Sequence, residues 1–164
     1  MTRQKNALRK HEIAPYDGEE EVPTSGWLPF GKNTTSITDE SEEKTDTAGD
    51  YSGDGNEEEV LIGRSEMWKY EGTDDTDDSA QNLIRSLKRT QTDEERMIWH
   101  RITEADGTVV VGPAKVLEII AGGGDATEYG AFTGSINFKG TPKVTKGPTD
   151  VEGDTSGDSG EEGA

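Results

Sequence analysis

Apolar side chains are confined to five short segments of the chain, and this confinement sets the size and kind of core that it can build. The segments are Val60–Tyr70, Leu83–Leu87, Met97–Ile102, Val109–Ile120 and Tyr129–Phe138. The stretches between them are rich in Asp, Glu, Gly, Ser and Thr, and could bury almost nothing. With 28% hydrophobic residues and a formal net charge of −18 over 164 residues, the chain has material for one small domain with long polar connections.

A hairpin is the strongest local prediction. The turn residues Ala105-Asp106-Gly107 join two β-rich segments, Glu95–Glu104 and Thr108–Ile120. An Asp-Gly pair between such segments is typical of a tight hairpin, because both residues tolerate the positive φ that the turn needs. Gly112-Pro113 interrupts the second segment and predicts a bulge or an edge position, since proline cannot donate to the ladder.

Three further strands are predicted. Tyr129–Phe138 alternates in polarity, with Phe132, Ile136 and Phe138 on one face. Val60–Tyr70 is predicted as a single strand; by the period of two, one face carries Val60, Ile62, Trp68 and Tyr70. Asn33–Thr38 is rich in threonine and suits a short strand.

One helix is predicted over Asp74–Arg89. Its apolar stripe consists of Ala80, Leu83, Ile84 and Leu87, at helical spacing. Aspartates crowd its start and basic residues its end, where each sign of charge is favoured. The stripe is expected to dock on a sheet, and the remaining predicted core aromatics are Trp27, Phe30 and Trp99.

The segment Asp39–Glu59 holds ten acidic residues and one lysine, and it is predicted to be a long loop. Loops of this length in compact domains are usually functional or disordered. The order of ligands in a calcium-binding EF-hand loop is not met, so no calcium site is expected.

Both ends of the chain are expected to lie outside the core. Met1–Val22 passes from basic to acidic and is expected to be a frayed end or an arm that orders on a neighbour. After Gly140 the core pattern is lost, and Thr149–Ala164 should be disordered. The predicted division is therefore an N-terminal arm over residues 1–25, a β domain over 26–140 and an acidic flexible tail over 141–164.

The sequence offers little chemistry. Cysteine is absent, which excludes disulfides and thiolate metal sites. His11 and His100 are the only histidines, and no nucleophile or phosphate-loop motif is present. No catalysis, metal or cofactor is expected. No apolar run reaches the length of a membrane span, and the negative charge disfavours sequence-specific binding of nucleic acid.

Several blocks follow one another in an order that is typical of one family. The first is Trp27-Leu28-Pro29-Phe30-Gly31. The most telling are Gly122-Gly123-Gly124-Asp125, followed by Glu128-Tyr129-Gly130, and the strand that ends in Gly140-Thr141-Pro142. Over about residues 27–139 the chain resembles the major tail proteins, or tail tube proteins, of siphophages that infect Gram-positive bacteria.

That resemblance implies a mainly β, sandwich or barrel-like fold with one flanking helix, a long acidic loop and flexible termini. It implies hexameric rings that stack into a tube in the virion tail, assembled in the cytoplasm of the bacterial host. The implied partners are other copies, a tape-measure protein, other tail proteins and DNA that passes without sequence-specific contact. The loop would bridge stacked rings, and its candidate residues are Asp39, Glu40, Glu42, Glu43, Asp46, Asp50, Tyr51 and Asp54.

Two other classes of function stay open at the level of sequence. The composition also fits an acidic, largely disordered viral interaction or scaffold protein. A capsid decoration protein of similar β-rich build is the other alternative. The hairpin and the alternating strands favour a folded β domain over the first of these.

Overall fold

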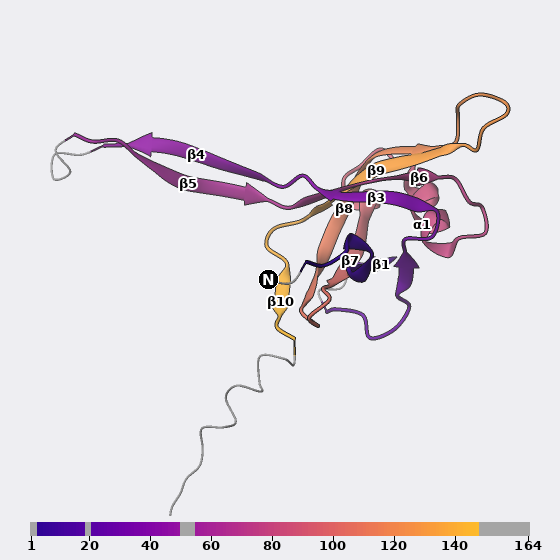
Figure 1. The fold of residues 1–164 in the computed structure, drawn as a ribbon, viewed down its shortest axis with the longest axis horizontal. Helices are drawn as coiled ribbons and strands as arrows, with labels where there is room; N and C mark the ends of the chain where they lie inside the picture. The colour runs from indigo at the N-terminus through magenta and orange to yellow at the C-terminus, as the bar shows by residue number, and fades with distance from the viewer. Residues whose placement is uncertain (1–2, 19–20, 50–54, 148–164) are drawn as a thin grey trace, which may run out of the picture.

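A computed structural model describes residues 3–18, 21–49 and 55–147 (Figure 1). These residues form ten strands, one α-helix and two short 3-10 helices at Asn6–Leu8 and Glu94–Arg96. The elements in chain order are β1 (Lys10–Pro15), β2 (Leu28–Phe30), β3 (Thr34–Asp39), β4 (Glu42–Ala48), β5 (Glu58–Ser65), β6 (Met67–Thr73), α1 (Ser79–Leu87), β7 (Met97–Thr103), β8 (Val109–Ala121), β9 (Ala131–Phe138) and β10 (Lys143–Thr145).

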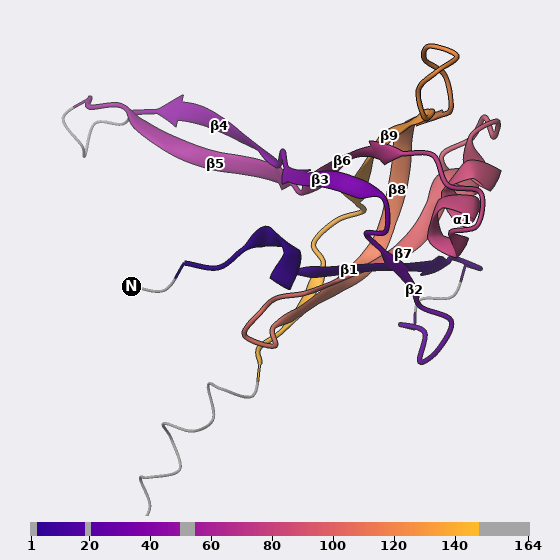
Figure 2. The same cartoon turned by 45° about the vertical axis from the view of Figure 1, so that its right-hand side comes forward.

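Eight of the strands form one antiparallel sheet, in the order β2-β1-β7-β8-β9-β6-β3, with β10 paired to β8. The sheet curls so strongly that it makes a half-barrel with β2 and β3 at its two edges (Figure 2). Among the strands that the structure describes, β4 and β5 pair only with each other and form a separate two-stranded sheet. The predicted mainly β fold with one flanking helix is confirmed, and its form is a curled sheet.

The main core lies on the face of the sheet that α1 covers. Ala80 and Ile84 are fully buried there, and Leu83 and Leu87 are half-buried against the same cluster. The sheet contributes these buried residues: Ile13, Phe30, Trp68, Tyr70, Ile98, Ile102, Ala114, Val116, Ile119, Phe132, Ile136 and Phe138. Phe132, Ile136 and Phe138 share this core, as the alternation in β9 predicts.

The helix begins five residues later than predicted. Asp78 caps it, and its carboxylate accepts a hydrogen bond from the backbone N–H of Ala80. The aspartates before Asp78 have other partners: the N–H of Asp74 donates to Gly130, and the N–H of Asp75 donates to the buried side chain of Gln81. These bonds tie the segment to the loop before β9 and to the first turn of α1, so it does not continue the helix.

A second, smaller cluster lies on the opposite face of the sheet. Ala14, Trp99 and Val111 are buried in it, with Tyr16 and Trp27 packed against them. The period of two places Trp99 on the other side of β7 from Ile98. Trp99 is therefore buried and Trp27 packs against it, but in this second cluster, whereas Phe30 lies in the main core that α1 covers.

The expected frayed end or arm is wrong for residues 10–15. These residues form β1, which lies between β2 and β7 inside the sheet. Ile13 is fully buried in the main core and Ala14 in the second cluster. The strand is short and basic at its start, so its sequence carries only a weak alternating pattern.

The predicted hairpin is confirmed, since β7 pairs with β8 from Thr103 opposite Val109 onwards. No bulge occurs at Gly112-Pro113 in this ladder; the irregularity in β8 falls between Leu117 and Ile120, where it pairs with β9. The carbonyl of Pro113 accepts from the N–H of Lys139. The backbone nitrogen and carbonyl of one residue in an antiparallel strand point to the same side of the strand. The nitrogen of Pro113, which carries no hydrogen, therefore faces the gap between β10 and β9.

The single strand predicted over residues 60–70 is wrong. The chain forms two strands that meet at Glu66 and belong to different sheets. Trp68 and Tyr70 of β6 are buried, but Val60 and Ile62 of β5 are 44% and 56% exposed.

Beyond Gly140, Lys143–Thr145 still joins the main sheet through β8. The predicted disorder of Thr149–Ala164 lies outside the described residues.

Candidate assembly surfaces

The acidic segment predicted as a loop is a β-hairpin over its described residues. β4 and β5 pair from Glu42 opposite Ser65 to Ala48 opposite Glu58, with an irregularity after Lys44. The hairpin extends away from the half-barrel at the end of β3 (Figures 1 and 2). Thr45, Thr47 and the run of Val60 to Ile62 favour extended backbone despite the surrounding acids.

The two strands of this hairpin bury almost none of their surface against the described part of the chain. Every residue of β4 is exposed, and Gly63 alone in β5 is half-buried. Val60, Leu61 and Ile62 are 44%, 56% and 56% exposed. An isolated two-stranded hairpin is at best marginally stable in water. Exposed aliphatic residues on both faces of such an element, Val60 and Ile62 on one and Leu61 on the other, favour coverage by another molecule.

The hairpin is also negatively charged. Its two strands carry five acidic residues, Glu42, Glu43, Asp46, Glu58 and Glu59, and two basic ones, Lys44 and Arg64, for a net charge of 2 − 5 = −3. The guanidinium of Arg64 lies 3.9 Å from Glu43 and 3.4 Å from Glu66, so it is engaged within the hairpin and at its base.

The structure brings five of the eight predicted bridging residues to this hairpin or its base. Glu42, Glu43 and Asp46 lie on β4. Asp39 ends β3, where its carboxylate accepts from the N–H of Ser41 at 2.9 Å, and Glu40 donates its N–H to Met67. The other three, Asp50, Tyr51 and Asp54, lie outside the described residues. Sequence reasoning missed the exposed aliphatic run, because the same alternation also fits a core strand.

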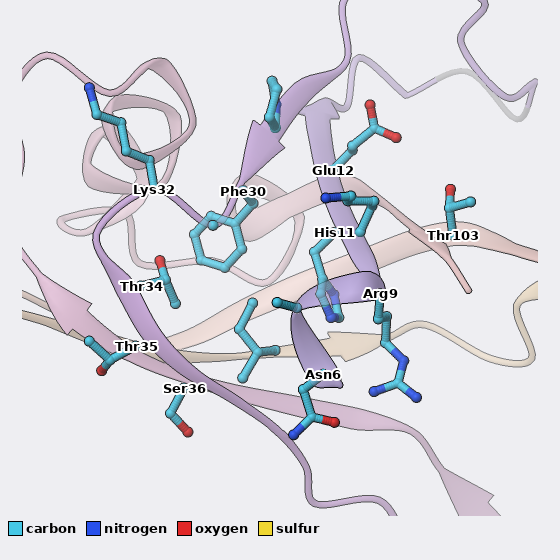
Figure 3. A pocket seen from close by; sticks show the side chains of 15 residues that line it. Asn6, Arg9, His11, Glu12, Phe30, Lys32, Thr34, Thr35, Ser36 and Thr103 are labelled. Carbon is cyan, nitrogen blue, oxygen red and sulfur yellow. The ribbon is translucent and has the colours of Figure 1, made fainter. Parts of the chain in front are cut away.

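A second candidate surface is a pocket of about 650 Å³ between the two edges of the half-barrel (Figure 3). We call it the seam pocket. Side chains from the first 3-10 helix and β1 line one side, and β2 and the first residues of β3 complete it. Its lining includes Arg9, Lys10, Lys32 and Glu12, which sum to a net charge of 3 − 1 = +2. This is an exception on a chain whose total charge is −18.

The three cations of the seam pocket differ in how they are paired. Arg9 contacts Glu104 at 2.9 Å. Lys32 lies 3.7 Å from Asp75, and its side chain is 68% exposed. Lys10 is exposed, and within residues 3–18, 21–49 and 55–147 it makes no ion pair. Lys10 and Lys32 are therefore open to a further anionic partner.

The two histidines form a buried pair beside this pocket. Nδ1 of His11 lies 3.1 Å from Nε2 of His100, and His100 stacks on Phe138. Burial, with a smaller contribution from the Arg9 cation, lowers the pKa of His11 to about 4. Burial and the neighbouring His11 hold the pKa of His100 well below its usual range. Both rings are thus neutral at pH 7, and one donates while the other accepts.

We expect this pair to make folding stability fall in mild acid. An unfolded histidine binds its proton near pH 6.5, whereas folded His11 does so only near pH 4. The contribution is therefore fully present above pH 6.5 and is lost as pH falls towards 4. At about 1.4 kcal/mol per pKa unit, His11 alone contributes about 3 kcal/mol to this loss. Denaturant unfolding at pH 7.0 and 4.5 measures it, and His11→Gln should show a shallower dependence; an equal loss in that variant would contradict the assignment.

Other chemistry is sparse in the described part of the chain. No group of three His, Asp or Glu there could hold a metal ion. No helix among the described residues is long and apolar enough to cross a membrane.

Comparison with known proteins identifies the fold. No family model matches the chain, and no curated protein matches its sequence. A chain in a structure of the tail of an empty gene transfer agent (GTA) particle, with C6 symmetry, superimposes with a TM-score of 0.63 at 11% identity, covering 87% of this chain and 99% of that one. A chain in the virion of a native GTA particle gives 0.64 at 14% identity, with the same two coverages. The chain therefore has the fold of a protein found in the tail of a gene transfer agent particle.

Proposed function

We propose that this protein is a structural subunit of a bacteriophage tail, which assembles into hexameric rings that stack to form the tail tube. The observation that carries the proposal is the β4–β5 hairpin, an ordered element with exposed aliphatic residues and almost no burial in its own chain. The exposure of these aliphatic residues is explained if other copies of the same chain cover them in the assembly.

Two further observations support a tube subunit. The fold covers nearly the whole of a chain from a tail with C6 symmetry. The half-barrel also leaves β2 and β3 as edge strands, each paired on one side only within the described residues. Exposed edges are a liability for a monomer, and strand pairing with another copy in an assembly removes them.

The hairpin is proposed to bridge stacked rings. It projects from the half-barrel and carries Glu42, Glu43 and Asp46 beside the aliphatic residues of β5. Asp39 and Glu40 lie at its base, and the predicted bridging segment includes Asp50, Tyr51 and Asp54 as well.

The charge of the chain fits a conduit for DNA. Six copies carry a formal charge of 6 × −18 = −108. Where that charge faces a lumen, it repels phosphates, so DNA passes without sequence-specific binding. In this proposal the tube encloses a tape-measure protein, joins other tail proteins and belongs to a siphophage of Gram-positive bacteria. The role is structural and involves no catalysis or cofactor.

Electron microscopy of the purified protein in negative stain, over a range of concentration and salt, tests the proposal. We expect rings with a central hole, or hollow tubes. Uniform small particles under all conditions would contradict self-assembly. If those particles decorated capsids when mixed with them, the decoration-protein alternative would replace the proposal.

A further inference from the structure

We infer that the seam pocket of one copy receives the β4–β5 hairpin of a second copy. The inference rests on the proposed self-assembly and names the surface on which the hairpin docks. The hairpin and the pocket are complementary in charge, in polarity and in backbone hydrogen bonding.

Charge complementarity is the first argument. The hairpin strands have a net charge of −3 and the pocket lining a net charge of +2. Lys10 and Lys32 of the pocket lining are exposed, and Glu58 and Glu59 are exposed on β5 next to the aliphatic run. On a chain this acidic, most other surfaces of a second copy would repel the hairpin.

The pocket also suits the apolar part of the hairpin. Phe30 and Ile37 line it, and a volume of about 650 Å³ holds several aliphatic side chains. Val60 and Ile62 share one face of β5 by the period of two and can enter such a site together, and both are exposed. An apolar contact ringed by ion pairs is the usual arrangement of a protein interface.

The edge of β3 supplies the third argument. Within the described residues β3 pairs with β6 only, and Thr34, Thr35, Ser36 and Ile37 line the seam pocket. An extended segment that enters the pocket can pair with this free edge through backbone hydrogen bonds.

The hairpin of the same copy does not reach this pocket. It leaves the sheet after Asp39, at the end of β3, and extends away from the half-barrel (Figures 1 and 2). The pocket is lined by the beginning of β3. The occupant therefore comes from a second copy, which gives a head-to-tail contact that repeats from copy to copy.

Charge reversal on both sides tests the docking. A pocket variant, Lys10→Glu with Lys32→Glu, and a hairpin variant, Glu58→Lys with Glu59→Lys, change only exposed side chains. Each should lower the yield of tubes, measured by sedimentation and electron microscopy, by about tenfold or more, because like charges then face each other. The two changes combined in one chain should restore assembly, since the pairs form again with their signs exchanged. Melting temperatures should stay close to that of the wild type.

Matched controls carry the same change in charge elsewhere. Lys139→Glu with Lys143→Glu is the control for the pocket variant, and Glu94→Lys with Glu95→Lys is the control for the hairpin variant; all four side chains are exposed and lie outside both surfaces. Both controls should assemble like the wild type.

The outcomes separate this inference from the proposed function. Normal tubes from the pocket variant, or a combined variant as defective as either part, would overturn the docking and leave a tail subunit whose hairpin binds elsewhere. A wild-type chain that forms neither rings nor tubes would overturn the proposed function itself.

Discussion

A chain whose hairpin is cut back to a short turn should fold normally and form no tubes. Glu43 and Arg64 lie directly opposite each other, so an Asn-Gly turn in place of residues 44–63 can close the shortened hairpin. None of the removed residues that the structure describes belongs to either core cluster. We therefore expect a melting temperature close to that of the full chain, with a complete loss of tubes by electron microscopy, because the surface proposed to bridge rings is gone.

A second variant tests the apolar surface of the hairpin while its length stays unchanged. Val60→Ser, Leu61→Ser and Ile62→Ser together keep the strand but remove its exposed aliphatic groups. We expect assembly to weaken strongly in this variant too, since burial of those groups drives the contact.

Normal tubes from the shortened chain would refute a bridging hairpin. Unfolding of the shortened chain would show that the hairpin stabilises the half-barrel.

Truncating Ile84 should destabilise the fold far more than truncating its neighbour Leu83. Ile84 is fully buried where α1 meets the sheet, whereas Leu83 is half-buried at the edge of the same contact. Ile84→Ala removes buried methyl and methylene groups and leaves a cavity, which costs about 2–5 kcal/mol. Leu83→Ala loses only part of that burial. Denaturant unfolding at neutral pH measures both free energies.

The exposed side of the same helix provides the control. Ser86 is exposed, and its hydroxyl bonds only to the carbonyl of Leu83 within the helix. Ser86→Ala should leave the free energy of unfolding nearly unchanged, because alanine is a better helix former. If Leu83→Ala lowered the free energy of unfolding as much as Ile84→Ala, α1 would have to pack on the sheet through a different face.

The local elements could be predicted because their signals lie within a few residues of one another. The Asp106-Gly107 turn sets the β7–β8 hairpin, alternation in β9 selects its buried face, and the spacing of Ala80 to Leu87 defines the buried stripe of α1. In each case the period of the backbone determines which side chains share a face. The resemblance drawn from the order of these blocks also anticipated the mainly β fold with one helix.

The candidate site was predicted in part. Composition alone singled out Asp39–Glu59 as a segment that cannot enter a core, and its described residues do stand outside the core. Its form was missed, because a strand that buries neither face needs no alternation. The aliphatic run of β5 is predicted as part of one strand with Trp68 and Tyr70, since the pattern continues into them without a break in the sequence.

The amino-acid sequence by itself determined the turns, the alternating strands, the helix and the acidic segment that no core could hold. Only the tertiary structure decided that β1 enters the sheet between β2 and β7, that the chain changes sheets at Glu66, and that β1, β2 and β3 enclose a basic pocket. The physical reason is that these features depend on pairing between residues far apart in the chain, such as His11 with His100. Periodicity and turn chemistry encode local backbone geometry, whereas long-range pairing is set by the burial that the whole sheet achieves together.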